Sequence, residues 1–261
     1  LSRLSMTRDF RDAMVNNDLH VNFQPIYDLS GDKIIAVEAL SRWEHPEHGL
    51  ISPEIFIPLA EKTRLINTLT YWVLEQSISQ VSSWHKINSK LLVAVNLSVF
   101  SFKDPKFITE VSLLLKKYNF PSDKLKLEIT ESAMMDDPLH ALGILEELHS
   151  MGIKLSIDDF GTGFSSMSYL QKFPVDELKI DKSFILGLDQ DESNDAIVRS
   201  TIDLAHNLGL NVIAEGVETK EELLICRKVG CHFVQGYFVQ RPTLKTKKIL
   251  KKYTNIIDLI N

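Results

Sequence analysis

Polar residues able to bind a metal ion or a phosphate end eight short apolar runs of the chain. They are Gln24, Glu38, Asn96, Glu128, Asp158, Lys179, Glu215 and Gln235. The runs read HVNFQ, KIIAVEAL, LLVAVNLS, LKLEITE, KLSIDDF, ELKID, NVIAEG and CHFVQG, and stretches long enough for an amphipathic helix separate most of them. Strands that alternate with helices form parallel sheets, whose carboxyl ends meet at one face. The pattern therefore predicts a closed barrel with its chemistry gathered at one mouth.

Carboxylates dominate this set of strand-end residues. Five of them could converge, with Asn96 as a neutral oxygen ligand: Glu38, Glu128, Asp158, Asp159 and Glu215. A lone Asp or Glu at a strand end more often caps a helix or meets a nearby Lys. An ordered set of oxygen ligands instead favours Mg²⁺ or Mn²⁺. The adjacent Asp158 and Asp159 could flank two ions about 3.5 to 4 Å apart, as two-metal phosphodiester hydrolysis requires. Lys179 could orient or help deprotonate an attacking water.

The period within the runs indicates which face of each strand is polar. In LKLEITE, Leu125 and Leu127 share one face, whereas Glu128 shares the other with Lys126 and Thr130. The apolar face is expected to pack on an outer ring of helices, which leaves the polar face inside the barrel. An open doubly wound sheet, which would have apolar residues on both faces of its strands, is the weaker alternative.

The first two runs are joined by YDLSGDK, which is too short for a crossover helix. They are therefore expected to form a hairpin that turns at Ser30 and Gly31 and places Gln24 close to Glu38. The first strand then runs antiparallel to the second. Helix starts are expected at Pro53, Asp104 and Thr219, and helix stops at Gly152, Gly209 and Gly230. The expected helices cover residues 5–17, 53–63, 66–86, 104–118, 137–150, 163–172, 193–208, 219–229 and 243–252.

Length and charge restrict the class of protein. The 261 residues are expected to form one domain, with the barrel at about 18–242 and a basic C-terminal helix at 243–252. A formal net charge of -6 argues against binding of a polymeric nucleic acid. The unpaired Cys226 and Cys231 favour a reducing compartment. Without an apolar run of membrane-spanning length, the expected location is the cytoplasm, or the cytoplasmic face of the inner membrane if a longer protein is anchored there. The chain starts at Leu, so it is expected to be cut from a longer protein with an upstream sensory or regulatory domain.

Two other motifs are set aside. His45 and His48 in HPEH lack the HExxH spacing of a zinc site, so a surface loop is favoured. Asp159-Phe160-Gly161 matches a kinase DFG triplet, but no glycine-rich loop or HRD triplet accompanies it.

The chain resembles the EAL-type cyclic di-GMP phosphodiesterases from about residue 7 to residue 247. The tripeptide Glu38-Ala39-Leu40 lies in VEALSRWEHPEHGLISPEIFIPLAE, and the motifs FQPI, VNLS, EITES, DDFGTGFSSMSYL, LKID, AEGVE and QGY follow the order of the family. Eight ordered motifs at strand ends are specific, whereas one tripeptide is not. The resemblance implies a modified (βα)8 barrel of the TIM type with an antiparallel first strand.

The resemblance also implies a role for each matching residue. Glu38, Asn96, Glu128 and Asp158 would bind a first metal ion, and Asp158 would share a second ion with Asp159 and Glu215. Lys179 would contact the attacking water, so that the catalytic set is Lys179, Glu215, Glu38 and Asp158. Substrate contacts would come from Gln24, Leu40, Arg42, Asn96 and Gln235. Supporting positions would be Glu131, which braces the DFGTG loop with its hinge residues Gly161 and Gly163, and Glu218.

The implied reaction is hydrolysis of cyclic di-GMP, a bacterial second messenger, to linear pGpG with two Mg²⁺ or Mn²⁺ ions. Ca²⁺ would inhibit. The family further suggests a homodimer formed through residues 163–172 and 193–208. Two alternatives stay open: a domain that binds cyclic di-GMP as an effector without cleaving it, and a protein-interaction domain.

Overall fold

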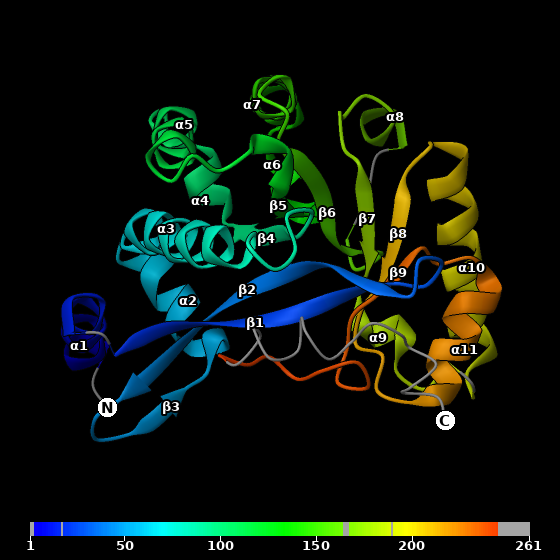
Figure 1. Ribbon diagram of the computed structural model, residues 1–261, viewed down its shortest axis with the longest axis horizontal. Coiled ribbons are helices and arrows are strands. Elements are labelled where there is room, and N and C mark those ends of the chain that lie inside the picture. Colours follow the sequence, from blue (N-terminus) through cyan, green and yellow to red (C-terminus); the bar gives the residue numbers. More distant parts are fainter. Residues whose placement is uncertain (1–2, 17, 164–166, 189, 245–261) are drawn as a thin grey trace.

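Eight strands close a barrel in the computed structural model, which describes residues 3–16, 18–163, 167–188 and 190–244 (Figure 1). In order around the barrel they are β1 (Leu19–Asp28), β2 (Lys33–His45), β4 (Leu92–Leu97), β5 (Leu125–Thr130), β6 (Lys154–Phe160), β7 (Glu177–Ile180), β8 (Asn211–Ala214) and β9 (Phe233–Val234). All eight apolar runs thus form strands. Because β1 pairs with both β2 and β9, the sheet closes and the open-sheet alternative is excluded.

The first strand is antiparallel to both of its neighbours, as the short connector predicts. The other neighbouring strands of the barrel pair in parallel. In the β1–β2 hairpin, Gln24 lies directly opposite Glu38. A short strand that the sequence analysis missed, β3 (Gly49–Ile51), pairs antiparallel with the far end of β2.

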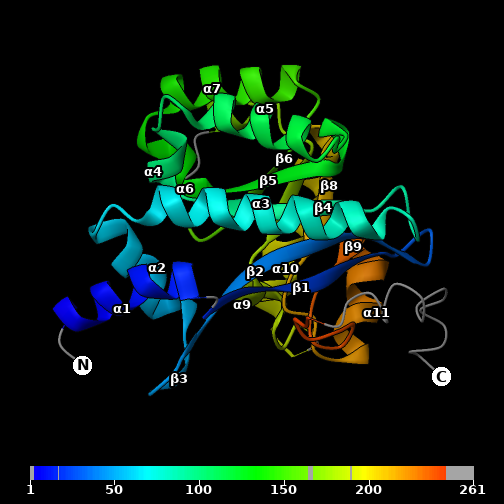
Figure 2. The same cartoon turned by 60° about the vertical axis from the view of Figure 1, so that its left-hand side comes forward.

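Helices surround the barrel (Figures 1 and 2). The longer ones are α1 (Arg3–Asn16), α2 (Pro53–Lys62), α3 (Ile66–Trp84), α5 (Phe107–Lys117), α7 (Pro138–Ser150), α10 (Glu192–Asn207) and α11 (Lys220–Val229). The short ones are α4 (Val99–Phe102), α6 (Glu131–Asp136), α8 (Met167–Leu170), α9 (Lys182–Ile185) and the 3-10 turn η1 (Ser122–Lys124). Figure 1 places α1 and β3 at one end of the molecule and α10 and α11 at the other.

Capping residues set several of these helix ends. At the start of α11, the Thr219 side chain accepts a hydrogen bond from Glu222 N–H, and the Glu222 carboxylate accepts one from Thr219 N–H. The same helix ends at Gly230, whose φ is 100°. Asp104, by contrast, does not start a helix. Its carboxylate accepts from Asn67 Nδ2, Tyr71 Oη and Lys106 N–H, so α5 begins only at Phe107. The expected helix at 163–172 is shorter in the described residues, since α8 covers Met167–Leu170, and the helix expected at 243–252 lies outside them beyond Leu244.

The two faces of the strands divide as the alternation predicts. Leu125, Leu127 and Leu155 point outward and are fully buried under the helices. Inside the barrel, a small apolar cluster of Ile26, Ala36, Ala94 and Ile213 lies in its centre. The acids and amides singled out in the sequence lie nearer the carboxyl ends of the strands, whereas Lys126, Ser156 and Glu177 are buried deeper in the barrel.

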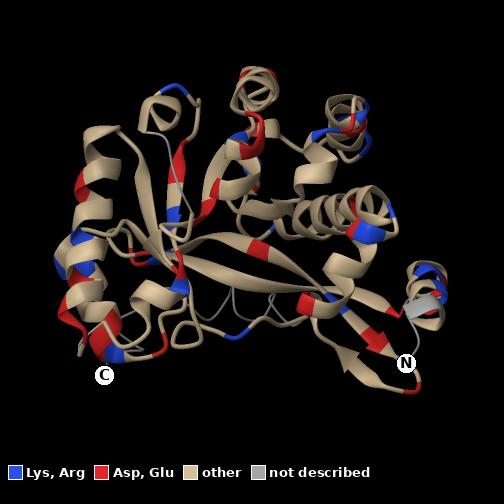
Figure 3. Cartoon of the chain, turned by 180° about the vertical axis from the view of Figure 1, so that it is seen from behind, with Lys and Arg blue, Asp and Glu red and all other residues tan. Residues whose placement is uncertain are grey.

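On the face seen in Figure 3, Lys and Arg are interspersed with Asp and Glu along the helices. Within the described part of the chain, no helix is both long and apolar enough to cross a bilayer.

Candidate active site

Lys179, on β7, lies at the centre of the barrel mouth with its side chain fully buried. Its Nζ is close to four carboxylates: 2.7 Å from Glu215 Oε1, 2.8 Å from Glu128 Oε2, 3.1 Å from Asp158 Oδ1 and 3.7 Å from Glu38 Oε2. These residues come from five different strands or strand ends, separated by up to 177 positions in the sequence (215 − 38). The barrel therefore assembles one cation within a ring of acids.

Side-chain amides orient the acid from β2. Asn96 Nδ2 donates to Glu38 Oε1 at 2.6 Å, and Gln235 Nε2 donates to Glu38 Oε2 and to Gln24 Oε1, the latter at 3.1 Å. Gln24 Nε2 in turn donates to the Gln240 carbonyl at 3.1 Å. Because the amide N–H groups are committed to these bonds, the side-chain oxygens of Asn96 and Gln235 remain available to the site.

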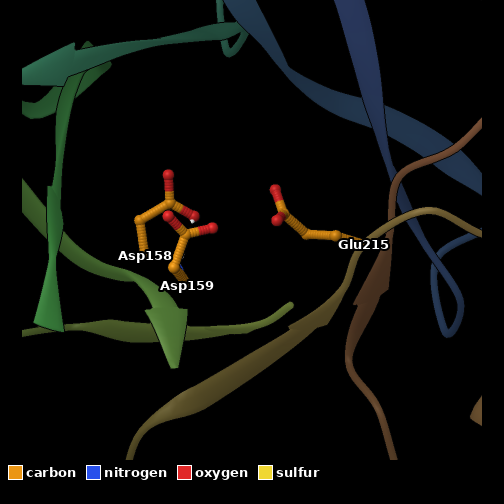
Figure 4. A group of neighbouring side chains, drawn as sticks. All are labelled: Asp158, Asp159 and Glu215. Carbon is orange, nitrogen blue, oxygen red and sulfur yellow. Dashed lines mark hydrogen bonds between the residues drawn. The ribbon is translucent and has the colours of Figure 1, made fainter. Parts of the chain in front are cut away.

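The neighbouring Asp158 and Asp159 both reach the mouth, although successive residues of a regular strand face opposite sides. Asp159 has a φ of +54°, and the β6–β7 register shifts between Ile157 and Phe160. This irregularity turns both carboxylates toward Glu215, as Figure 4 shows. Oxygen atoms of the three side chains lie within 4.8 Å of one another, a spacing that could hold a metal ion.

Burial and mutual repulsion shift the protonation of the acids. Burial raises the pKa of Glu215 to about 8, against the opposing effect of Lys179. Burial and the nearby Asp158 raise the pKa of Asp159 to about 6, and burial also raises the pKa of Glu128. Burial alone would lower the pKa of Lys179, but Asp158, Glu128 and Glu215 outweigh it and raise the pKa above its ordinary value. One ammonium group therefore does not satisfy the whole acidic cluster.

The residues present fit a divalent cation. Glu128 Oε1 and Gln235 Oε1 are buried and accept no hydrogen bond from any described residue. Buried oxygens of this kind ordinarily have a partner. Carboxylate and amide oxygens are also the ligands that Mg²⁺ and Mn²⁺ favour. A bound cation would give both of these oxygens the partner that they lack.

A cavity of about 560 Å³ adjoins the acidic cluster, and its lining includes three of the expected substrate contacts, Leu40, Arg42 and Asn96. Apolar residues of α2 and α3, among them Ile57 and Leu69, form another part of its wall. Arg42 is half-buried there, and its Nη1 donates to the Ser41 carbonyl at 2.8 Å. The site thus combines an acidic centre with a neighbouring space of the size and character that ligand pockets have.

The supporting positions lie at different distances from the cluster. Glu131 is buried, and its Oε2 accepts from Gly161 N–H at 3.0 Å, which ties the start of α6 to the end of β6. A Cβ at Gly163 would lie 3.4 Å from the Glu131 carboxylate. Unlike Glu131, Glu218 has an exposed side chain, and its backbone N–H donates to Glu222 Oε2.

Comparison with known proteins decides the family. The sequence model for the EAL domain matches residues 7–242. The chain belongs to the EAL domain family.

Two relatives of this EAL domain are proteins of Pseudomonas aeruginosa. The bifunctional diguanylate cyclase/cyclic di-GMP phosphodiesterase MucR is 41% identical over 92% of the chain and 35% of its own length. The cyclic di-GMP phosphodiesterase NbdA is 38% identical over 92% of the chain and 31% of its length. The chain thus spans about a third of these curated relatives. A solved structure of the PaMucR phosphodiesterase in complex with c-di-GMP superposes with a TM-score of 0.89 at 41% identity, covering 92% of this chain and 97% of that one.

Three parts of the site were not predicted from the sequence. Asp181, two residues after Lys179, contributes to the raised pKa of Asp159 and caps α9 through Ser183 N–H at 2.9 Å. The Gln240 carbonyl anchors Gln24, and no side-chain pattern signals a backbone acceptor. The third part is the pair of Lys126 and Glu177 beneath the cluster, for which the inward-facing Lys126 was a usable signal.

Proposed function

We propose that this EAL domain hydrolyses one phosphodiester bond of cyclic di-GMP to give linear pGpG, and that the reaction requires divalent metal ions. The observation that carries the proposal is the ring of four carboxylates within 4 Å of the Lys179 ammonium at the barrel mouth. Relatives named as cyclic di-GMP phosphodiesterases, at 38% and 41% identity, support the choice of substrate.

Two Mg²⁺ or Mn²⁺ ions would be held by the acids and by the Asn96 oxygen. The first would bind Glu38, Asn96, Glu128 and Asp158, and the second would bind Asp158, Asp159 and Glu215. Bound there, the ions would neutralise charge on the phosphate and lower the pKa of a water molecule. Ca²⁺ prefers longer bonds and looser geometry, so we propose that it inhibits.

The other steps belong to side chains of the domain. Lys179 orients the attacking water and, through its contacts at 2.7 and 2.8 Å, keeps Glu215 and Glu128 from repelling each other. Asn96 and Gln235 hold Glu38 in one orientation through their amide groups. This scaffold fixes the reacting groups before substrate arrives, which lowers the entropic part of the barrier.

Substrate would be held on the side of the mouth where β2 continues past Glu38. Arg42 can bind a phosphate with its planar fork of donors. Leu40 and the apolar wall of the neighbouring cavity offer contact to a nucleotide base. Gln24, anchored on Gln240, would complete the contacts from β1.

We also propose a homodimer formed through α8 and α10. An apolar groove of about 450 Å³ lies there, lined by residues that include Phe160, Met167, Ile197 and Leu204. Phe160 directly follows the Asp158–Asp159 pair, so an interface at this groove would contact the element that carries both acids. We further propose a cytoplasmic location. Because the relatives are about three times as long as this chain, we also propose that another domain of a longer protein controls the activity.

Glu38→Gln tests the proposed function because it removes a charge without changing the size of the side chain. Glu44→Gln is the matched control, since Glu44 lies on the same strand but is exposed. We expect Glu38→Gln to lower pGpG formation by at least a hundredfold, with Glu44→Gln unchanged. Binding of cyclic di-GMP without hydrolysis in the unmodified domain would favour an effector. Neither binding nor hydrolysis would favour a protein-interaction domain.

A further inference from the structure

A second ion pair lies inside the barrel beneath the acidic cluster. Lys126 on β5 and Glu177 on β7 form a salt bridge, and only 2% and 6% of their surfaces are exposed. Taking two charges out of water is costly, and their attraction often does not recover that cost, so stability alone is a weak explanation for a buried pair. Its place in the barrel calls for another explanation.

The polarity of this pair is opposite to that of the pair above it. On β5, Lys126 lies two residues before Glu128, and on β7, Glu177 lies two residues before Lys179. Residues two apart on a strand face the same side. Since Lys179 Nζ contacts Glu128 Oε2 at 2.8 Å, the two pairs are stacked in the barrel interior with their signs reversed.

Both pairs span β6, the strand between β5 and β7. On β6, Ser156 is in register with Glu128 of the upper pair on one side and with Glu177 of the lower pair on the other. Ser156 is buried and small, so the two long side chains can meet across it. The arrangement therefore forms a square of alternating charges: positive Lys126 below Glu128, and negative Glu177 below Lys179.

We propose that Lys126 and Glu177 are positioning residues that keep the Lys179–Glu128 pair in its observed orientation, with the ammonium group directed into the acidic cluster. This inference rests on the proposed hydrolysis for its effect on turnover but not for its effect on stability.

Each charge of the lower pair attracts the charge directly above it. Unlike charges this close in a buried site attract more strongly than they would in water, which favours one orientation of the buried ammonium group.

A charge exchange distinguishes two roles of the lower pair: orienting the Lys179–Glu128 pair, or only linking β5 to β7. The variant Lys126→Glu/Glu177→Lys keeps an internal ion pair but places like charges along both strands. The variant Lys126→Met/Glu177→Gln removes both charges and keeps similar side-chain volumes, a replacement that buried ion pairs often tolerate. Circular dichroism, urea unfolding without metal, and kcat and KM with cyclic di-GMP are measured for both variants and the unmodified domain.

We expect the exchanged variant to unfold at lower urea concentration than the neutral variant. We expect kcat to fall about tenfold in the neutral variant and further in the exchanged one, with KM changed less than threefold. If the exchanged variant has the same stability and kcat as the unmodified domain, the proposal is overturned, because an ion pair that only links β5 to β7 would work in either polarity. If the exchanged variant does not fold, the neutral variant decides: a kcat equal to that of the unmodified domain overturns the proposal. If the unmodified domain hydrolyses nothing, the proposed function fails, and the order of unfolding still tests the positioning.

Discussion

Lys179 Nζ lies 2.7 Å from Glu215 Oε1, where the ends of β7 and β8 meet at the barrel mouth. The ammonium group is fully buried, and three further carboxylates lie within 4 Å of it. The Lys179 ammonium thus holds together a cluster that would otherwise repel itself, so Lys179 has a structural role in addition to the chemical role proposed for it.

Replacement of Lys179 by Met should therefore affect both stability and turnover. Removing one partner of a buried ion pair costs about 3 to 5 kcal/mol, and we expect the metal-free domain to lose an amount of this order in urea unfolding. With metal present, kcat should fall at least a hundredfold while nucleotide affinity changes less than tenfold. Lys117→Met, on an exposed ion pair of α5, is the control and should change neither. Equal losses of affinity and kcat would make Lys179 a binding residue.

Exchange of the metal ion probes the geometry of the acidic cluster. With Ca²⁺ in place of Mg²⁺, we expect turnover to fall at least tenfold, because Ca²⁺ takes more ligands at longer distances. The measurement is the initial rate over a range of each ion, followed by competition of Ca²⁺ against fixed Mg²⁺. Equal rates with both ions would contradict the two-metal account.

Gly236 should tolerate no side chain. A Cβ there would lie 2.0 Å from the Val217 carbonyl oxygen, so Gly236→Ala must displace the backbone that carries Gln235. We expect a loss of about 1 to 3 kcal/mol in the free energy of unfolding, together with lower activity. Gly143→Ala is the matched control, since nothing lies within 4 Å of its Cβ and α7 should gain up to about 1 kcal/mol. Equal effects at the two glycines would refute the close approach.

His232 should make the domain sensitive to acid. Burial, with help from His206, lowers its pKa, and Val212 N–H donates to His232 Nδ1 at 3.0 Å. Because the folded state disfavours the protonated ring, the stability that His232 contributes is present above its ordinary pKa of about 6.5 and is lost as pH falls below it. The Asn side chain can keep the acceptor without titrating. We expect His232→Asn to reduce the loss in the free energy of unfolding as pH falls below about 6.5.

The exposed His149 supplies the control for this measurement. His149→Asn should leave the slope of unfolding free energy against pH as it is in the unmodified domain. An unchanged slope in His232→Asn would show that other groups cause the acid sensitivity.

The strands and the membership of the acidic cluster could be predicted because they rest on local patterns. Alternation with period two marks the inner face of β5, and the short YDLSGDK connector permits only a hairpin, which brings Gln24 opposite Glu38. The short elements β3, α4, α6 and α9 were missed, since three to six residues give too little periodicity to detect.

Long-range geometry could not be predicted from such patterns. The left-handed backbone of Asp159 depends on the register shift between β6 and β7, so the sequence showed two adjacent acids but not that both face the mouth. The start of α5 was misplaced because Asp104 bonds to Tyr71 and Asn67, residues more than thirty positions away. Lys126 was recognised as facing inward, but its partner Glu177 lies across another strand.

Nucleotide chromatography tests the central claim most directly. The purified domain is incubated with cyclic di-GMP and Mg²⁺, and a parallel reaction contains EDTA. We predict that linear pGpG forms only in the reaction with free Mg²⁺. Intact cyclic di-GMP after incubation with a folded, Mg²⁺-supplied domain, or equal pGpG formation in EDTA, would contradict the account.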